Sequence, residues 1–241
     1  MHGRPFVLIH GAWHGGWCWQ SIQEDLGQHG SPSFAPTLPG LAERAPLMSR
    51  ELSLMRMVED TVAYLMRENV EEAVLVGHSF GGSVITGVAD QIPERIAALV
   101  YLDAAIIEAG ETPFDRVPEA TRDERIRGAR EHDGGVSMPP PPGAAFGLGP
   151  QEAWAIDRLT PHPLASYETP LRLDGPVGNR LPAAYVSCTT PRYPGLASSE
   201  EWARRRRWRM ESLPTAHDAM LLMPTATAAL LHRLDNELSA P

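Results

Sequence analysis

The residues best suited to chemistry stand in the segment 77–81, which reads Gly-His-Ser-Phe-Gly. An apolar run at 73–76 precedes it and predicts a strand, and a segment typical of a helix follows it. A serine held on such a tight strand-to-helix turn projects its hydroxyl away from the backbone and can act as a nucleophile. The flanking glycines lack a Cβ, so the two backbones can approach closely around the turn. We therefore predict Ser79 as a nucleophile, the alternative being a turn without catalytic use.

A glycine-rich loop near the start of the sequence could stabilise negative charge next to that serine. The segment 6–17 opens with an apolar run that predicts a strand and continues as His-Gly-Ala-Trp-His-Gly-Gly-Trp. A serine hydrolase directs two backbone N–H groups at the oxyanion of its tetrahedral intermediate, one from the residue after the nucleophile and one from such a loop. By position, these donors are Phe80 and Ala12. We expect Trp13 and His14, on the same loop, to contact the substrate.

A serine nucleophile needs a base, and in the chain order serine, acid, histidine that base comes late. Nine histidines are present, and five of them precede the serine or adjoin it. His132 and His162 fall in a Pro/Gly-rich region with no expected strand to position them, and His232 falls within an expected helix. His217 lies in a loop between an expected strand and the last expected helix, so we predict it as the base.

Three landmarks, at 10–17, 77–82 and 217–220, resemble in order and spacing those of the α/β-hydrolases, and within that fold those of the hydroxynitrile lyase and plant methylesterase group. The third landmark reads His-Asp-Ala-Met. The resemblance implies an α/β-hydrolase fold and ester hydrolysis, because bacterial members of the group are mostly assigned as esterases with poorly defined substrates. It covers nearly the whole chain, although residues 105–180 are similar only as a cap of plausible length.

Two positions separate esterases from lyases in this group. The lyases carry a threonine where this chain has Gly11, and a lysine directly after the catalytic histidine, where this chain has Asp218. A cyanide leaving group needs a nearby cation, which a carboxylate would oppose, and the small Gly11 leaves room near the serine for an acyl group and water. Both differences favour ester hydrolysis. A lyase and a non-catalytic protein that binds a small molecule are the competing interpretations.

The acid is where the chain departs from the group's pattern, although an acid is expected because it orients the histidine and stabilises the imidazolium. Plant relatives carry an aspartate just after the matching strand, whereas here the strand 183–188 is followed by Thr-Thr-Pro-Arg-Tyr. Asp103 directly follows an expected strand and preserves the order serine, acid, histidine, so we predict it as the acid. Glu200 and Glu201 are the reserve. A capping role for Asp103, or a dyad without an acid, would also fit the sequence.

Strands and helices alternate along most of the chain. The expected strands are 6–9, 33–36, 74–76, 96–102, 183–188 and 208–212. The expected helices are 17–28, 52–68, the helix that follows the serine turn at 77–81 (the nucleophile elbow) and runs to about 91, 199–206 and 225–237. This alternation predicts an α/β fold with a mostly parallel, doubly wound sheet and helices on both faces. Ligands then bind at the carboxyl ends of the strands, where Ala12, Ser79 and Asp103 fall.

The segment 105–180 breaks the alternation, because it is rich in proline and glycine. Its apolar residues favour a packed cap over the site rather than a disordered loop. We therefore expect an α/β-hydrolase core at 1–104 and 181–241, with a cap insertion at 105–180.

Composition limits the classes of partner. The 241 residues carry 21 Lys and Arg against 30 Asp and Glu, a formal net charge of −9, which argues against nucleic acid or an anionic membrane as a partner. The basic run 204–209 is interpreted as a helix end rather than a nuclear or nucleic-acid signal, since cations suit that end. No stretch approaches the roughly 18 apolar residues of a membrane-spanning helix.

The sequence gives no sign of a cofactor or a metal site. Cys18 and Cys188 lie far apart without metal-ligand spacing, and the glycines within 11–16 lack the spacing of a dinucleotide loop. We expect reduced thiols, no signal peptide and a cytoplasmic enzyme. The expected partner is a small hydrophobic or aromatic ester. A homodimer is compatible with the sequence, which leaves the oligomeric state open.

Overall fold

Six parallel strands form the central sheet of the computed structural model, which describes residues 3–238. Across the sheet the strands lie in the order β2 (Ser33–Phe34), β1 (Phe6–Ile9), β3 (Ala73–His78), β4 (Ile96–Leu102), β7 (Ala183–Cys188) and β8 (Arg209–Leu213). The chain passes from β1 to β2 on one side and then returns to β3 on the other. At such a switch point the loops after the two strands diverge and leave a crevice for a ligand. The predicted parallel, doubly wound sheet is confirmed.

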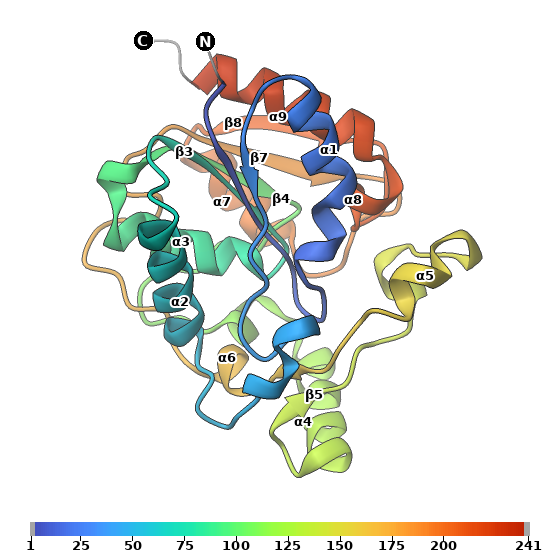
Figure 1. Ribbon diagram of the computed structural model, residues 1–241. Coiled ribbons are helices and arrows are strands. Elements are labelled where there is room, and N and C mark those ends of the chain that lie inside the picture. The colour runs from blue at the N-terminus through green and yellow to red at the C-terminus, as the bar shows by residue number, and fades with distance from the viewer. Residues whose placement is uncertain (1–2, 239–241) are drawn as a thin grey trace.

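Helices cover both faces of this sheet (Figure 1). One face packs against α1 (Gln20–Gln28) and α9 (Pro224–Leu238), and the other against α2 (Leu54–Arg67), α3 (Gly81–Gln91) and α7 (Ala197–Arg205). Successive side chains of a strand point to opposite faces. Phe6 and Leu8 of β1 therefore join the first core, while Val7 and Ile9 join the second. Because both faces are covered, the central strands are apolar runs without alternation.

The long connection between β4 and β7 builds a separate group of elements, most of them short, at one end of the sheet (Figure 1). They are η4 (Pro113–Arg116), α4 (Glu119–Asp133), β5 (Ser137–Met138), η5 (Gly143–Phe146), η6 (Pro150–Glu152), α5 (Ala153–Ile156), β6 (His162–Pro163) and α6 (Ala165–Glu168). β5 and β6 pair as a two-stranded antiparallel sheet. Phe114, Phe146 and Tyr167 are buried in the same core cluster as the main sheet. The segment is thus packed against the core, and its standing as a cap domain stays a prediction.

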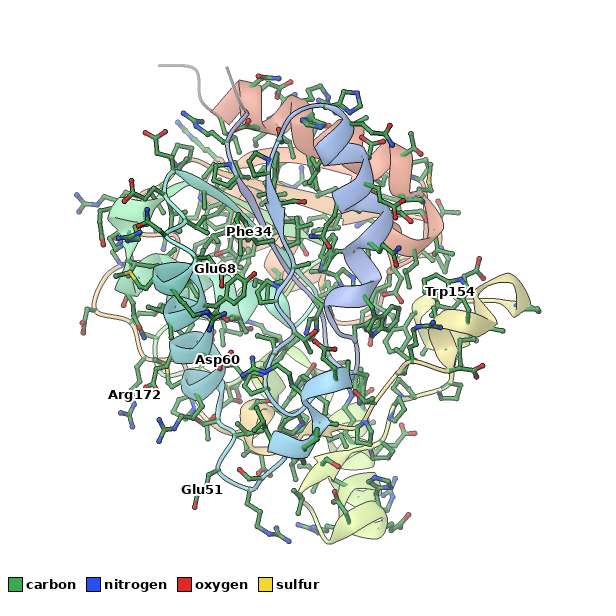
Figure 2. All side chains as sticks on the ribbon, in the orientation of Figure 1. Phe34, Glu51, Asp60, Glu68, Trp154 and Arg172 are labelled. Carbon is green, nitrogen blue, oxygen red and sulfur yellow. The ribbon has the colours of Figure 1, made fainter. Side chains whose placement is uncertain are left out.

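The four-residue helix α5 lies at the edge of the molecule, where Figure 2 labels Trp154. Its indole ring lies 5.8 Å from that of Trp17 on η1 (Gly16–Trp19), so an edge-to-face contact joins this segment to the core. The remaining short elements are η2 (Ala42–Leu47), η3 (Pro93–Arg95) and α8 (Ala219–Leu222). No helix among the described residues is both long and apolar enough to cross a membrane.

Most expected elements are present, with small differences at their ends. The elbow strand runs to His78 rather than ending at residue 76, because its last residues pair with Tyr101 and Leu102 of β4. The strand expected at 33–36 is only two residues long, since it pairs with β1 through Phe6 and Val7 alone. The helix expected at 17–28 divides into η1 and α1.

Candidate active site

Ser79 lies on the turn between β3 and α3, in a backbone conformation that serine rarely adopts. Its φ is 53°, in the left-handed region. The Ser79 carbonyl accepts hydrogen bonds from the N–H groups of Gly82 (3.1 Å) and Ala105 (3.0 Å), which hold the turn. A Cβ on Gly77 would lie 2.7 Å from the Gly81 carbonyl oxygen, so the turn needs a glycine there. The predicted elbow is therefore present, and the half-buried Ser79 lines a cavity.

Asp103 and His217 meet although 114 residues separate them in the sequence. Asp103 directly follows β4, and its Oδ2 lies 2.6 Å from His217 Nδ1. Its other carboxylate oxygen accepts a 3.0 Å hydrogen bond from the Cys188 N–H at the end of β7. Both side chains are buried. The pairing leaves His217 Nε2 without a hydrogen-bond partner among residues 3–238, and no hydrogen bond joins it to the Ser79 hydroxyl in this structure.

The two alternative candidates for the acid, Glu200 and Glu201, pair with arginines instead of His217. Glu200 forms salt bridges with Arg192 (2.5 Å), in the loop before α7, and with Arg204 (2.9 Å), on α7 itself. Glu201 is exposed and lies 3.9 Å from Arg205. Neither contacts His217 in the part of the chain that the structure describes, so the geometry favours Asp103 among the three candidates.

The two backbone N–H groups predicted to bind an oxyanion are both unpaired. No hydrogen bond is found for the amide of Ala12 or of Phe80 within the described residues, although both residues are buried. Buried backbone donors almost always have a partner, so a pair without one indicates a place for a ligand oxygen. The next amide, that of Trp13, is instead 3.4 Å from His162 Nδ1, and Trp13 has a φ of 66°.

The sequence did not reveal that His162 contacts the residues next to Ala12 and Ser79. It was expected to lack a strand, but it lies buried on β6, where its Nε2 is 2.8 Å from the Ser166 hydroxyl. Its ring also packs edge-to-face on Phe80, with 4.7 Å between the ring centroids. One histidine from the long connection thus touches the loop of Ala12 and the turn of Ser79 together. A two-residue strand has no periodicity, so no sequence signal could have found it.

A second imidazole–carboxylate pair lies behind the loop 10–15, here called the oxyanion loop because it carries the Ala12 amide predicted to bind an oxyanion. His14 Nδ1 donates to the Ala12 carbonyl (2.8 Å), and His14 Nε2 lies 3.0 Å from Asp218 Oδ2. Burial alone would lower the pKa of His14, but the Asp218 carboxylate outweighs it and raises that pKa. The His14 cation in turn holds the pKa of Asp218 below its usual range despite burial. The pair is therefore an ion pair, and His14 does not line the cavity that was expected to take the substrate.

His78, the residue before the serine, is buried beside this pair. Burial, reinforced by the neighbouring His217, lowers the pKa of His78 well below its usual range, so the ring is neutral. Its Nε2 donates to the His217 carbonyl over 3.1 Å, which ties the elbow to the histidine loop. A Cβ on Gly11 would lie 2.9 Å from His78 Nδ1 and 3.0 Å from the Ser79 Cβ, so this position has no room for a larger residue. The space beside Gly11 is thus filled by protein, and the expectation that it leaves room for an acyl group and water is wrong.

A cavity of about 240 Å³ opens above Ser79. Its walls come from the oxyanion loop, the elbow, the long connection and the loop after β7. The apolar and aromatic residues that line it include Trp13, Phe80, Pro113, Val117, Tyr167 and Tyr193. Tyr193 also stacks on the His217 ring, with 3.9 Å between centroids and 17° between planes, so it connects His217 to the cavity. Of the two predicted substrate contacts, Trp13 lies in this cavity.

Among residues 3–238, two groups of side chains could present three metal ligands within 4.8 Å of one another: Asp25 with His29 and His232, and His78 with His217 and Asp218. In the second group, Asp218 is already paired with His14 and His78 Nε2 with a carbonyl. The arrangement around Ser79 needs no metal for acyl transfer, and the absence of a metal and a cofactor stays a prediction.

The chain is similar to characterised proteins over most of its length. It is 33% identical over 240 residues to a carbendazim hydrolyzing esterase of Nocardioides sp. (strain SG-4G), a match that covers 95% of this chain and 98% of that protein. It is 32% identical over 111 residues to methylesterase 18 of Arabidopsis thaliana, but that match covers only 46% of this chain and 42% of the methylesterase.

Solved structures with the same fold include an extracellular alpha/beta-hydrolase from a Paenibacillus species, described as sharing structural and functional homology with tobacco salicylic acid binding protein 2. It superposes with a TM-score of 0.83 at 22% identity and covers 96% of this chain and 98% of its own. The sequence profile of the alpha/beta hydrolase family matches residues 6–230, which include every element of the central sheet. The chain therefore belongs to the alpha/beta hydrolase family.

Proposed function

We propose that the protein is a serine-dependent carboxylic ester hydrolase that cleaves a small hydrophobic or aromatic ester through an acyl-serine intermediate. The observation that carries this proposal is the 2.6 Å contact between Asp103 and His217 Nδ1. This contact engages one nitrogen of the His217 ring and leaves the other, Nε2, able to accept a proton. The esterase named among its relatives, matched over nearly the full length of both chains, supports the same reaction class.

In the proposed reaction, His217 Nε2 takes the proton of the Ser79 hydroxyl as the serine oxygen attacks the ester carbonyl. The amides of Ala12 and Phe80 donate to the resulting oxyanion, and loss of one such donor typically costs about 3 kcal/mol in the transition state. The imidazolium, stabilised by Asp103, returns the proton to the leaving alkoxide, and the alcohol departs. Water then repeats the sequence on the acyl-serine and releases the acid.

A lyase reaction of the hydroxynitrile type is less well supported. It would benefit from a cation beside the base, and this chain has Asp218 there, fully buried and paired with His14. It would also need space for a threonine at position 11, which the contacts of Gly11 with His78 and Ser79 leave no room for. A binding protein without catalysis would not need the ordered contact between Asp103 and His217.

The proposal extends to the setting of the enzyme. Residues 105–180 act as a cap over the site, since Val117, Arg125 and Tyr167 of this segment line the cavity. Trp13 contacts the substrate, whereas His14 holds the oxyanion loop from behind.

A cytoplasmic location accords with two free, buried cysteines, and cell fractionation tests it against the extracellular location described for the Paenibacillus neighbour. A homodimer would be detected by sedimentation.

Hydrolysis of 4-nitrophenyl acetate by the wild type and by Ser79→Ala tests the proposal. Wild-type turnover that falls by at least about 10³-fold in the variant is expected, because the nucleophile is removed. Equal rates in both proteins would reject the serine mechanism. Cleavage of mandelonitrile faster than of any ester would instead favour the lyase. Circular dichroism of both proteins controls for folding.

A further inference from the structure

Two arginines line the cavity above Ser79, and their surroundings differ. Arg116 forms a salt bridge with the Glu111 carboxylate, and its Nε donates to the Ile106 carbonyl over 2.9 Å. Its charge is therefore neutralised within the protein. Arg116 anchors the segment that follows β4 and offers little to a ligand.

Arg125, on α4, has no carboxylate within 4.0 Å among the described residues. Its guanidinium carbon lies 4.9 Å from the ring centroid of Trp13 and 5.5 Å from that of Tyr167. One nitrogen, Nη2, donates to the Tyr193 hydroxyl over 3.3 Å, so the group is held by neutral aromatic residues rather than by an anion. All three aromatic partners line the cavity, and the charged end of Arg125 lies in its wall.

This arrangement leaves a half-buried cation without a counter-ion within residues 3–238. A guanidinium carries five N–H donors in one plane, and its fork matches the two oxygens of a carboxylate. Stacking on aromatic rings uses the faces of the guanidinium and leaves its edges for hydrogen bonds. A ligand carboxylate would therefore find a preorganised, partly desolvated partner here, and it would meet no protein carboxylate already in that place.

Arg125 and Ser79 lie on walls of the same cavity, one from α4 and one from the elbow. Trp13 connects them, because it follows Ala12 in the oxyanion loop while its ring carries the guanidinium. The wall between them includes Phe80 and Tyr167, whose rings stack with centroids 5.1 Å apart. A substrate whose ester carbonyl lies at Ser79 can thus extend an apolar spacer along this wall and reach Arg125.

We infer that Arg125 binds a carboxylate that the substrate carries in addition to the scissile ester, so that the preferred substrates are monoesters of dicarboxylic acids. This inference rests on the proposed ester hydrolysis for its kinetic test, although not for its binding test. It names Arg125 as the specificity-determining residue of the site, with Trp13, Tyr167 and Tyr193 holding the guanidinium in place.

The kinetic test uses methyl monoesters of dicarboxylic acids from succinic to terephthalic acid, each paired with its uncharged amide. For at least one pair, the wild type should hydrolyse the acid with a kcat/KM at least about tenfold above that of the amide, the gain expected of a charge-assisted hydrogen bond. Arg125→Gln should bring the ratio of acid to amide close to one. Arg127→Gln, an exposed arginine on the same helix, is the matched control and should keep the wild-type ratio.

Amides cleaved as well as acids throughout the series would overturn the inference, and so would a ratio unchanged in Arg125→Gln. Calorimetric titration of terephthalate into Ser79→Ala separates this result from a failure of the esterase proposal, because it needs no turnover. Binding that weakens at least tenfold on adding Arg125→Gln supports the carboxylate site even in a protein that cleaves no ester. Equal binding by both variants rejects the site even if 4-nitrophenyl acetate is hydrolysed.

Discussion

Two buried imidazole–carboxylate pairs lie next to each other in this molecule, and they use their nitrogen atoms differently. In the pair of His217 and Asp103, Nδ1 contacts the carboxylate at 2.6 Å and Nε2 has no partner within the described residues. In the pair of His14 and Asp218, both nitrogens are engaged, one by the Ala12 carbonyl and one by the carboxylate at 3.0 Å. A base must keep one nitrogen available, so the first pair suits proton transfer and the second suits positioning.

The second carboxylate also differs in its position along the chain. Asp218 directly follows His217, yet its carboxylate pairs with His14, 204 residues earlier, at 3.0 Å, and lies within 4.8 Å of a His217 ring nitrogen without a hydrogen bond to it in the described residues. The pair therefore joins the loop that carries the Ala12 amide to the loop that carries His217. A net-neutral ion pair holds two proposed parts of the site together without placing an unpaired charge next to His217.

Removing the charge of one carboxylate at a time tests most directly whether the two pairs have different roles. Asp103→Asn should lower kcat for 4-nitrophenyl acetate by about 10³-fold or more, because the amide no longer holds His217 with Nε2 free to accept a proton. Asp218→Asn should lower it by less than about tenfold, because that side chain touches no reacting atom. Steady-state kinetics on both variants measures the difference. A loss below tenfold for Asp103→Asn would remove it from the proposed triad.

A second, smaller contrast is one of folding stability, between the buried pair of His14 and Asp218 and a partly exposed pair elsewhere. Asp218→Ala leaves the His14 imidazole buried without its carboxylate, and breaking a buried pair in this way costs about 3 kcal/mol of unfolding free energy. Asp25→Ala is the matched control, because it breaks a partly exposed pair with His29 at 3.3 Å and should cost less than about 1 kcal/mol. Urea unfolding measures both values. Equal losses would mean that the His14 pair contributes no more than a surface contact.

The same two pairs show what could be predicted from the sequence. Ser79 and Asp103 directly follow apolar runs, and parallel strands bring such positions to one edge of the sheet. The contact of Asp103 with His217 could therefore be expected from chain order. The contact of His14 with Asp218 could not, because a local pattern does not tell which of two carboxylates turns toward which histidine.

The segment 105–180 could be predicted only in outline, for a related reason. Proline and glycine at 105–180 indicated a departure from the βα repeat, but the contacts made by its short elements come from long-range packing. The contacts of His162 with the oxyanion loop and of Arg125 with the cavity wall are of this long-range kind. Neither side chain stands in a pattern with a period, so only the folded arrangement identifies their partners.

The pH dependence of folding stability tests whether the pair of His14 and Asp218 is ionised. The pKa of His14 is raised above its ordinary value of 6.5, so its contribution to folding is complete below that pH and is lost as the pH rises through the raised value. The pKa of Asp218 is lowered from 3.8, so its contribution is present above that pH and is lost as the pH falls through the lowered value. The pair therefore stabilises the fold most between these two ordinary values.

The unfolding free energy lost in Asp218→Ala should consequently be largest near about pH 5 and decrease above about pH 6.5, by at most about 1.4 kcal/mol per pH unit for one proton. His14→Gln should give the same trend, because either change removes the pair. Urea unfolding from about pH 5 to about pH 8 measures both. A loss that stays constant over this range, or grows with pH, would show that His14 is neutral. The second pair would then be an ordinary hydrogen bond, and the two pairs would differ only in the nitrogen atom that His217 leaves free.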